Sequence, residues 1–285
     1  MSSADVGARV RTTAEQGGGT TVPERHGLSF GGLLRSEWIK LWSLRSTYWC
    51  FGIAVALTVG FGLLVASAVA SSSDHTSATA ALAEAATAGT SVAELVVAVL
   101  GALVVAGEYG TGMIRTTFLA APRRVDALAA KALTFGLVAF ALGILSVAVS
   151  TAIAASIFLA AGLHPDLADG GLWAALLGGA GAIALVGLLA VGVGMLVKNT
   201  AAAITLTVGL LFVLPIILSI VGAVTRADWF TNAVGYLPSQ AASRMASLAP
   251  HAAAMLDPWQ AALVLAAWVV VFLGIGLFVA ERRDA

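Results

Sequence analysis

The sequence predicts an all-α integral membrane protein built from six transmembrane helices. Its 285 residues are 59% hydrophobic and only 11% charged, with a mean hydropathy of +0.96, whereas a soluble domain carries about 25% charged residues. Six stretches hold the roughly 20 apolar residues that a helix needs to cross a bilayer. They are continuous runs of Ala, Leu, Val and Gly, without the alternation of β-barrel strands. A soluble enzyme is therefore excluded.

The predicted transmembrane domain covers residues 47–280. Its third span is long enough to tilt or to extend beyond the bilayer. The fourth is so rich in glycine that we expect it inside the bundle, where small residues let helices approach closely. Only residues 198–200 separate the fourth span from the fifth, which predicts a tight turn. The six spans are residues 47–70, 91–107, 132–161, 171–197, 201–224 and 259–280.

The distribution of basic residues predicts the orientation. All but two of the 15 Lys and Arg residues flank the spans on one side, and the exceptions are Arg226 and Arg244. Because cytoplasmic loops are enriched in Lys and Arg, we expect both termini in the cytoplasm. Residues 1–27, which are rich in Gly, Thr and charge, are then a disordered cytoplasmic tail, and residues 281–285 are a second cytoplasmic tail.

Residues 28–46 predict an amphipathic helix at the membrane interface, ahead of the first span. An apolar face of Leu34, Trp38, Leu41 and Trp42 opposes a polar face of Ser36, Glu37, Lys40 and Ser43. The tryptophans would lie at the level of the lipid headgroups, with the basic residues toward the cytoplasm. The candidate functional residues of this helix are Trp38, Lys40, Trp42 and Arg45. A simple juxtamembrane anchor fits the same pattern.

The segment after the second span, residues 108–131, reads EYGTGMIRTTFLAAPRRVDALAAK. It is too polar to span, yet Met113, Ile114 and Phe118 offer an apolar helical face. Gly112 permits a sharp bend, and Pro122 ends a helix that precedes it. We expect a short helix parallel to the membrane, with its arginines facing the cytosol; a plain basic loop is the alternative.

Two features are predicted near the opposite side of the membrane. The long outer loop, residues 225–258, contains Pro238, which favours the start of a short helix. Such a loop can re-enter the membrane if its backbone groups are buried in protein. Pro215 lies in the middle of the fifth span and predicts a kink, which is either purely structural or a hinge.

Glu94 is the only acidic residue expected within a span. An ionisable residue inside a membrane is a functional candidate by default. However, Ser91 and Glu94 have the spacing of a capping box. The two interpretations are helix capping and a contact with a substrate or a proton.

Several kinds of chemistry are missing from the sequence. The four histidines and single cysteine lack metal-ligand spacing, no lysine lies in a GxxxxGK[ST] context, and no span histidine or lysine could activate a span serine. The zero net charge offers no attraction to nucleic acid. We expect no enzyme activity, no cofactor bound by this chain and no nucleic-acid partner. Uncharged spans suit an apolar or amphipathic cargo, with energy supplied from elsewhere.

Two motifs and their order resemble a known family. LLRSEWIKLWSLRSTYW ahead of six spans, and EYGTGMIRTTFLAAPRR after the second, are similar to permease subunits of type 2 ABC exporters, the small actinobacterial ones above all. The resemblance covers residues 30–282. It implies a dimer of six-span chains, identical or related, that exports its substrate with two copies of a separate cytosolic ATPase, which binds ATP and Mg²⁺. With the topology, it also implies a bacterial cytoplasmic membrane.

The resemblance also implies roles for individual residues. The segment after the second span would be the coupling helix, which docks in a groove of the ATPase, and the outer loop would form re-entrant helices. Relatives commonly have Gly-Thr where this chain has Gly112-Met113. The implied coupling residues are Glu108, Tyr109, Gly112, Arg115 and Arg124. The alternative class is a non-transporting scaffold or sensor that recruits a cytosolic partner through this segment.

Overall fold

The computed structural model describes residues 29–72, 77–114, 124–225, 228–248 and 256–282. All regular secondary structure in these ranges is helical. Six helices are long and apolar enough to cross a membrane, which confirms the predicted helical class and the number of spans. The predicted tail, residues 1–27, and the last three residues of the chain lie outside the described ranges.

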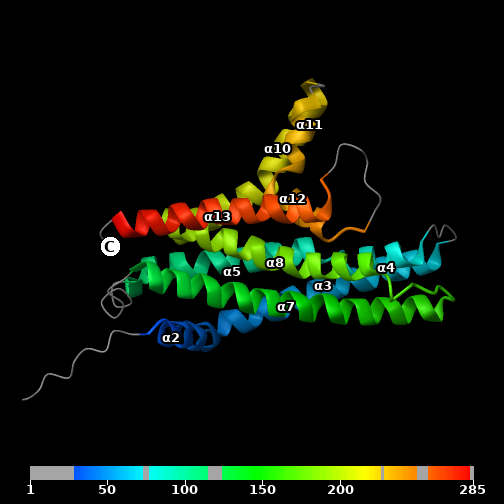
Figure 1. The fold of residues 1–285 in the computed structure, drawn as a ribbon, viewed down its shortest axis with the longest axis horizontal. Helices are drawn as coiled ribbons and strands as arrows, with labels where there is room; N and C mark the ends of the chain where they lie inside the picture. Colours follow the sequence, from blue (N-terminus) through cyan, green and yellow to red (C-terminus); the bar gives the residue numbers. More distant parts are fainter. Residues whose placement is uncertain (1–28, 73–76, 115–123, 226–227, 249–255, 283–285) are drawn as a thin grey trace, which may run out of the picture.

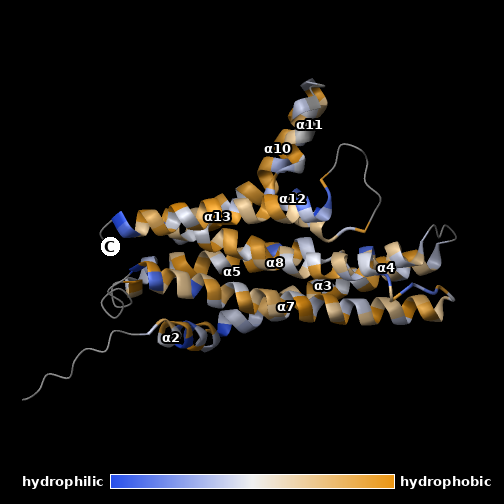
Figure 2. Cartoon of the chain, in the orientation of Figure 1, coloured by the Kyte–Doolittle hydropathy of each residue, from blue (hydrophilic) through white to orange (hydrophobic). Residues whose placement is uncertain are grey.

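The long helices lie side by side along one axis (Figure 1) and are hydrophobic over most of their length (Figure 2). α7 begins eight residues before the predicted third span, and α5 extends four residues beyond the predicted second span. Both extensions contain charged residues that the prediction placed in a loop. The spans are α3 (Arg45–Ser71), α5 (Thr90–Thr111), α7 (Arg124–Ala160), α8 (Gly170–Val197), the fifth span from α9 (Thr200–Val208) to α10 (Leu214–Thr225), and α13 (Pro258–Arg282).

α8 lies at the centre of the bundle, packed against α5, α7 and α13. Most of its residues are buried, so the predicted interior position of the glycine-rich span is confirmed. A Cβ atom at Gly101 of α5 would lie 2.6 Å from the carbonyl oxygen of Gly187 of α8. Glycine at this position therefore permits the close approach of the two helices.

The predicted tight turn between the fourth and fifth spans is also confirmed. Lys198 adopts a left-handed conformation, with φ of 55°, and ends α8. Asn199 then caps α9, because its side-chain oxygen accepts a hydrogen bond of 3.0 Å from the backbone nitrogen of Ala202. The chain thus reverses direction within two residues.

The N-terminal helix, α2 (Phe30–Ser43), begins at the cap Ser29, whose hydroxyl accepts a hydrogen bond from the nitrogen of Gly32. It is separated from α3 by one extended residue, Leu44. Its buried face differs from the predicted one. Leu33, Glu37 and Leu41 face the bundle, whereas Trp38 is half exposed.

The fifth span contains a π-helical segment, η1 (Gly209–Val213), directly before Pro215. Such segments and prolines are the usual causes of helix kinks. Beyond this point α10 turns away from the bundle (Figure 1), and its residues Ile216, Ile220 and Val224 are exposed. The predicted break in the helix is present, and a hinge role for Pro215 stays a prediction.

Three short helices complete the described part of the fold. α12 (Pro238–Met245) begins at Pro238 as predicted and buries Ala241, Ala242 and Met245 against α8 and α13. It follows α11 (Asp228–Gly235). α4 (Ala78–Thr87) was not predicted, because its ten residues, ATAALAEAAT, are too short to form a span of their own and lie ahead of the predicted second span. It packs against α3 and α7.

Candidate functional site: a buried charge cluster

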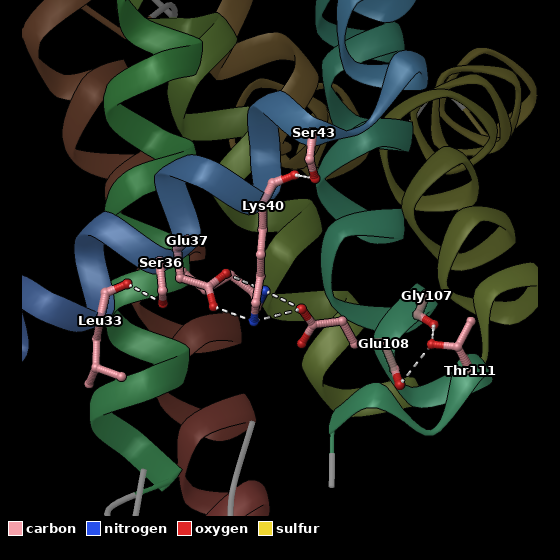
Figure 3. A network of polar contacts seen from close by, with 9 residues as sticks. Leu33, Ser36, Glu37, Lys40, Ser43, Gly107, Glu108 and Thr111 are labelled. Carbon is pink, nitrogen blue, oxygen red and sulfur yellow. Dashed lines mark hydrogen bonds and ion pairs between the residues drawn. The ribbon is translucent and has the colours of Figure 1, made fainter. Parts of the chain in front are cut away.

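Four charged side chains from three helices meet where α5 ends and α7 begins (Figure 3). Lys131 Nζ of α7 lies 2.5 Å from Glu37 Oε2 of α2 and 2.8 Å from Glu108 Oε1 of α5. Lys40 Nζ, also on α2, lies 2.8 Å from Glu37 Oε1 and 3.4 Å from Glu108 Oε1. We call these four residues the charge cluster.

The charge cluster is buried on one side and reaches solvent on the other. The Lys131 side chain is 3% exposed, and those of Glu37 and Glu108 are 6% and 7% exposed, whereas Lys40 is 35% exposed. Two carboxylates and two ammonium groups give no net charge. These buried ions are tolerated because each has a partner of opposite charge. Removal of one partner would leave the other charge buried and would lower the free energy of unfolding.

The local sequence explains how Glu37 enters the interior. Leu33, Glu37 and Leu41 follow one another at four-residue spacing, so they share the helical face that packs on α7. The neighbouring hydroxyls do not join the cluster. Ser36 donates to the carbonyl of Leu33, and Ser43 donates to that of Lys40. The predicted solvent-facing position of Glu37 is therefore wrong.

Lys40 stays charged in this setting. Burial acts to lower its pKa, but the hydrogen bond and the charge of Glu37, together with the charge of Glu108, outweigh that effect and raise the pKa above its usual 10.5. The cluster consequently keeps Lys40 as a positively charged partner at neutral pH.

The residues implied for ATPase coupling do not share one surface. Glu108 lies in the last turn of α5 and is buried in the charge cluster, not in a loop. Tyr109 is half-buried, with Lys198 Nζ 5.1 Å from its ring centroid. Gly112 ends α5 with φ of 73°, a conformation that favours glycine. Arg124 begins α7, and Arg115 lies outside the described residues, as does most of the predicted parallel helix.

The candidate residues of the N-terminal helix also separate into two groups. Lys40 joins the charge cluster, whereas Trp42 packs with aromatic rings. The centroid of its ring lies 5.8 Å from that of Trp38 and 5.3 Å from that of Tyr48. Arg45 begins α3 and is exposed. This aromatic group connects α2 to the first turn of α3.

The sequence prediction missed Glu37 and Lys131 as site residues. A glutamate at four-residue spacing between two leucines was one available signal. A lysine within an alanine-rich run that continues into an apolar span was another. Each suggests an ionisable group on a buried helical face.

Glu94 lies in the first half of α5 and is buried, and no hydrogen-bond partner contacts its Oε1. The capping-box interpretation is wrong, because α5 begins after Gly89 and has no side-chain cap. Ser91 therefore lies within the first turn instead of at the cap. A contact with substrate or a proton stays a prediction.

A cavity of about 550 Å³ lies near this end of α5, between α3, α4 and α12. Hydroxyl groups line much of its wall, with the carboxylate of Glu84 as the charged group. Thr87 connects two of the surrounding segments, because its hydroxyl lies within hydrogen-bond distance of the carbonyls of Ala83, at 2.8 Å, and Ala246, at 3.2 Å. The hydroxyl-bearing residues are Ser72, Ser77, Thr87, Thr90, Ser91, Ser243 and Ser247.

Within the described ranges, no three His, Cys, Asp or Glu residues are close enough together to hold a metal ion. The sequence matches no protein-family model, and a comparison with curated proteins finds none that is similar.

Proposed function

We propose that this chain is the membrane-spanning permease subunit of an ABC exporter in a bacterial cytoplasmic membrane. With a second permease half, identical or related, it forms the pathway for export of an apolar or amphipathic substrate. A separate cytosolic ATPase, in two copies, binds ATP and Mg²⁺ and supplies the energy. The six apolar spans, and the two motifs around residues 33–49 and 108–124, support this assignment.

The charge cluster is the observation that carries the proposal. Glu108 lies four residues before Gly112, the residue that ends α5 and where the coupling helix would begin. It is ion-paired to α7 through Lys131 and to α2 through Lys40. A force applied to that segment would reach three helices at once. Separating them would leave buried charges without partners, which costs several kcal/mol, about 3–5, so the three helices would move together.

The mechanism follows from this connection. ATP binding would bring the two ATPase subunits together, and each would push on one coupling segment. Rigid-body movement of the two permease halves would then open the pathway on the opposite side. The substrate leaves because the outward-facing state binds it less well, and the ATPases supply that difference in free energy. The π-helical segment and Pro215 are where the fifth span would bend.

The test is affinity purification of the tagged full-length chain in mild detergent from its native host, followed by mass spectrometry. We expect a P-loop ATPase at one copy per permease chain. Its absence, even after crosslinking, would contradict the proposal and favour the alternative of a scaffold or sensor that recruits a different cytosolic partner.

In the same experiment, the variant Lys131→Met separates docking of the ATPase from its response to the permease. It breaks the connection between α7 and the other two helices without changing any residue of the implied docking surface. We expect the ATPase to co-purify with this variant while its ATP hydrolysis no longer responds to the permease. Arg35→Met, which removes an exposed basic residue of α2 outside the charge cluster, is the matched control and should keep that response.

A further inference from the structure

A cleft of about 400 Å³ opens beside the charge cluster, between α2, α5 and α7. This volume is in the range of small-molecule sites, about 300–1,000 Å³. Along α5 its lining extends from Leu103 to Thr111, a rise of about 12 Å at 1.5 Å per residue. The cleft therefore follows the helix from its end toward the middle of the span.

The two ends of the cleft differ in polarity. Toward the middle of the span it is lined by Leu103, Val104 and Phe135, and α2 adds Leu41 and Leu44. At the other end the lining includes all four residues of the charge cluster, with Thr111 and Met113 following Glu108 along the chain. A molecule that fits this shape has a long apolar part and a polar head.

The charge cluster leaves one acceptor unused. Glu108 Oε1 accepts hydrogen bonds from both lysines, at 3.4 and 2.8 Å, but Oε2 is buried and has no hydrogen-bond partner among the residues that the structure describes. A buried acceptor without a donor costs about 1–3 kcal/mol. Glu108 lines the cleft, so a hydrogen-bond donor bound at this end would satisfy Oε2 once the carboxylate turns toward it, and a charged donor would bind more strongly than a neutral one.

The net charge of the cluster further limits which kind of polar head the cleft can bind. The two carboxylates already neutralise the two lysines, so no net positive charge attracts an anionic head. A zwitterionic head matches the cluster, with a cation toward Glu108 and an anion toward Lys40, which is the exposed member.

We propose that this cleft binds one aminophospholipid of the phosphatidylethanolamine type. Its primary ammonium donates to the Glu108 carboxylate, its phosphate lies near Lys40, and an acyl chain occupies the apolar end against Leu103 and Val104. The inference does not depend on the export function, because it rests only on the lining of the cleft and on the orphaned oxygen of Glu108.

Gly107 offers a way to close the cleft without touching the charge cluster. It lines the cleft, and a Cβ atom placed there has no atom of another residue within 4 Å. Gly107→Phe fills the space with a side chain that the backbone accepts. Gly274→Phe is the matched control, since Gly274 of α13 also has open space around it and is remote in sequence from the cleft.

The experiment uses the full chain, delipidated in detergent and titrated with phosphatidylethanolamine or with phosphatidylcholine of the same acyl chains, and native mass spectrometry counts bound lipids. Phosphatidylcholine is the informative probe because its quaternary ammonium has no N–H donor. We expect one phosphatidylethanolamine per chain, bound at least about tenfold more tightly than phosphatidylcholine, as one hydrogen bond to a charged group provides.

Gly107→Phe should abolish that preference and Gly274→Phe should keep it, with both variants eluting as the unaltered chain does in size exclusion. If Gly107→Phe fails to elute normally, the smaller Gly107→Leu takes its place. Equal binding of the two lipids, tighter binding of an anionic phosphatidylglycerol, or a preference that survives closure of the cleft would each overturn the proposal.

Discussion

Both ends of α5 bury a glutamate, and the surroundings of the two differ. Glu108, near the end of the helix, shares its carboxylate with Lys40 and Lys131. Glu94, near the start, has an Oε1 atom without a partner and lies close in sequence to the hydroxyl-lined cavity. A buried carboxylate with paired charges can hold helices together, whereas one without them costs free energy. The comparison predicts that Glu108 holds helices together, in addition to the lipid contact proposed for it, and keeps Glu94 as the candidate for a substrate contact.

The largest expected effect is that of Lys131→Met. It leaves Glu37 and Glu108 buried with only the half-exposed Lys40 as a common partner. We expect the free energy of unfolding in detergent to fall by about 3–5 kcal/mol, the usual cost of breaking a buried ion pair. Chemical denaturation followed by circular dichroism measures it. An unchanged unfolding midpoint would show that the charge cluster does not hold the three helices together.

A matched pair of substitutions tests the comparison directly. Glu108→Gln loses charge-assisted hydrogen bonds and should cost about 1.5–3 kcal/mol. Glu94→Gln removes a buried carboxylate that lacks ion pairs and should leave stability unchanged or raise it slightly. The same denaturation assay measures both. A loss of stability for Glu94→Gln as large as that for Glu108→Gln would mean that Glu94 has a structural role as well.

In activity, as opposed to stability, we expect Glu94→Gln to be the variant that changes the response to substrate. If Glu94 contacts the substrate, Glu94→Gln changes substrate-stimulated ATP hydrolysis while the ATPase still co-purifies with the chain. Unaltered stimulation across every compound that stimulates the natural chain would remove Glu94 from the candidate binding residues.

The smallest expected effect concerns Lys40 and pH. Because its pKa is raised above 10.5 in the folded chain, its contribution to stability is fully present below that value and is lost as pH rises through the folded pKa. A group this exposed contributes only about 0.2–1 kcal/mol. Hydrogen exchange of α2 should thus be protected equally at neutral and mildly alkaline pH, after correction for the intrinsic rate. Lys40→Met should remove any further loss of protection above pH 10.5.

The spans could be predicted from the sequence because long apolar runs report directly on a helix in a bilayer. The start of α12 at Pro238 and the interior position of α8 also follow from local residue chemistry. The charge cluster could not be predicted in this way. Glu37 and Lys131 are 94 residues apart in the chain, and the local pattern that signals a buried position for each does not show that the two side chains meet.

α4 escaped prediction for a related reason. Its residues Leu82, Ala83 and Ala86 are completely buried, but only because α3 and α7 cover them. Ten residues are too few to cross a membrane alone, and the helix's own sequence does not show that neighbouring helices bury it.

The π-helical segment in the fifth span affects which residues of that helix face the bundle. Ala203, Thr207, Leu211 and Pro215 are buried at a strict four-residue interval. In an α-helix of 3.6 residues per turn, such a row drifts around the axis by about 40° at each step. The wider turn of residues 209–213 cancels part of that drift, so the row stays in phase with the bundle. Deletion of one residue there would convert the wide turn into an ordinary α-helical turn, so the exposed isoleucines of α10 would keep nearly their present direction, whereas the same deletion in a regular α-helix would rotate them by about 100°.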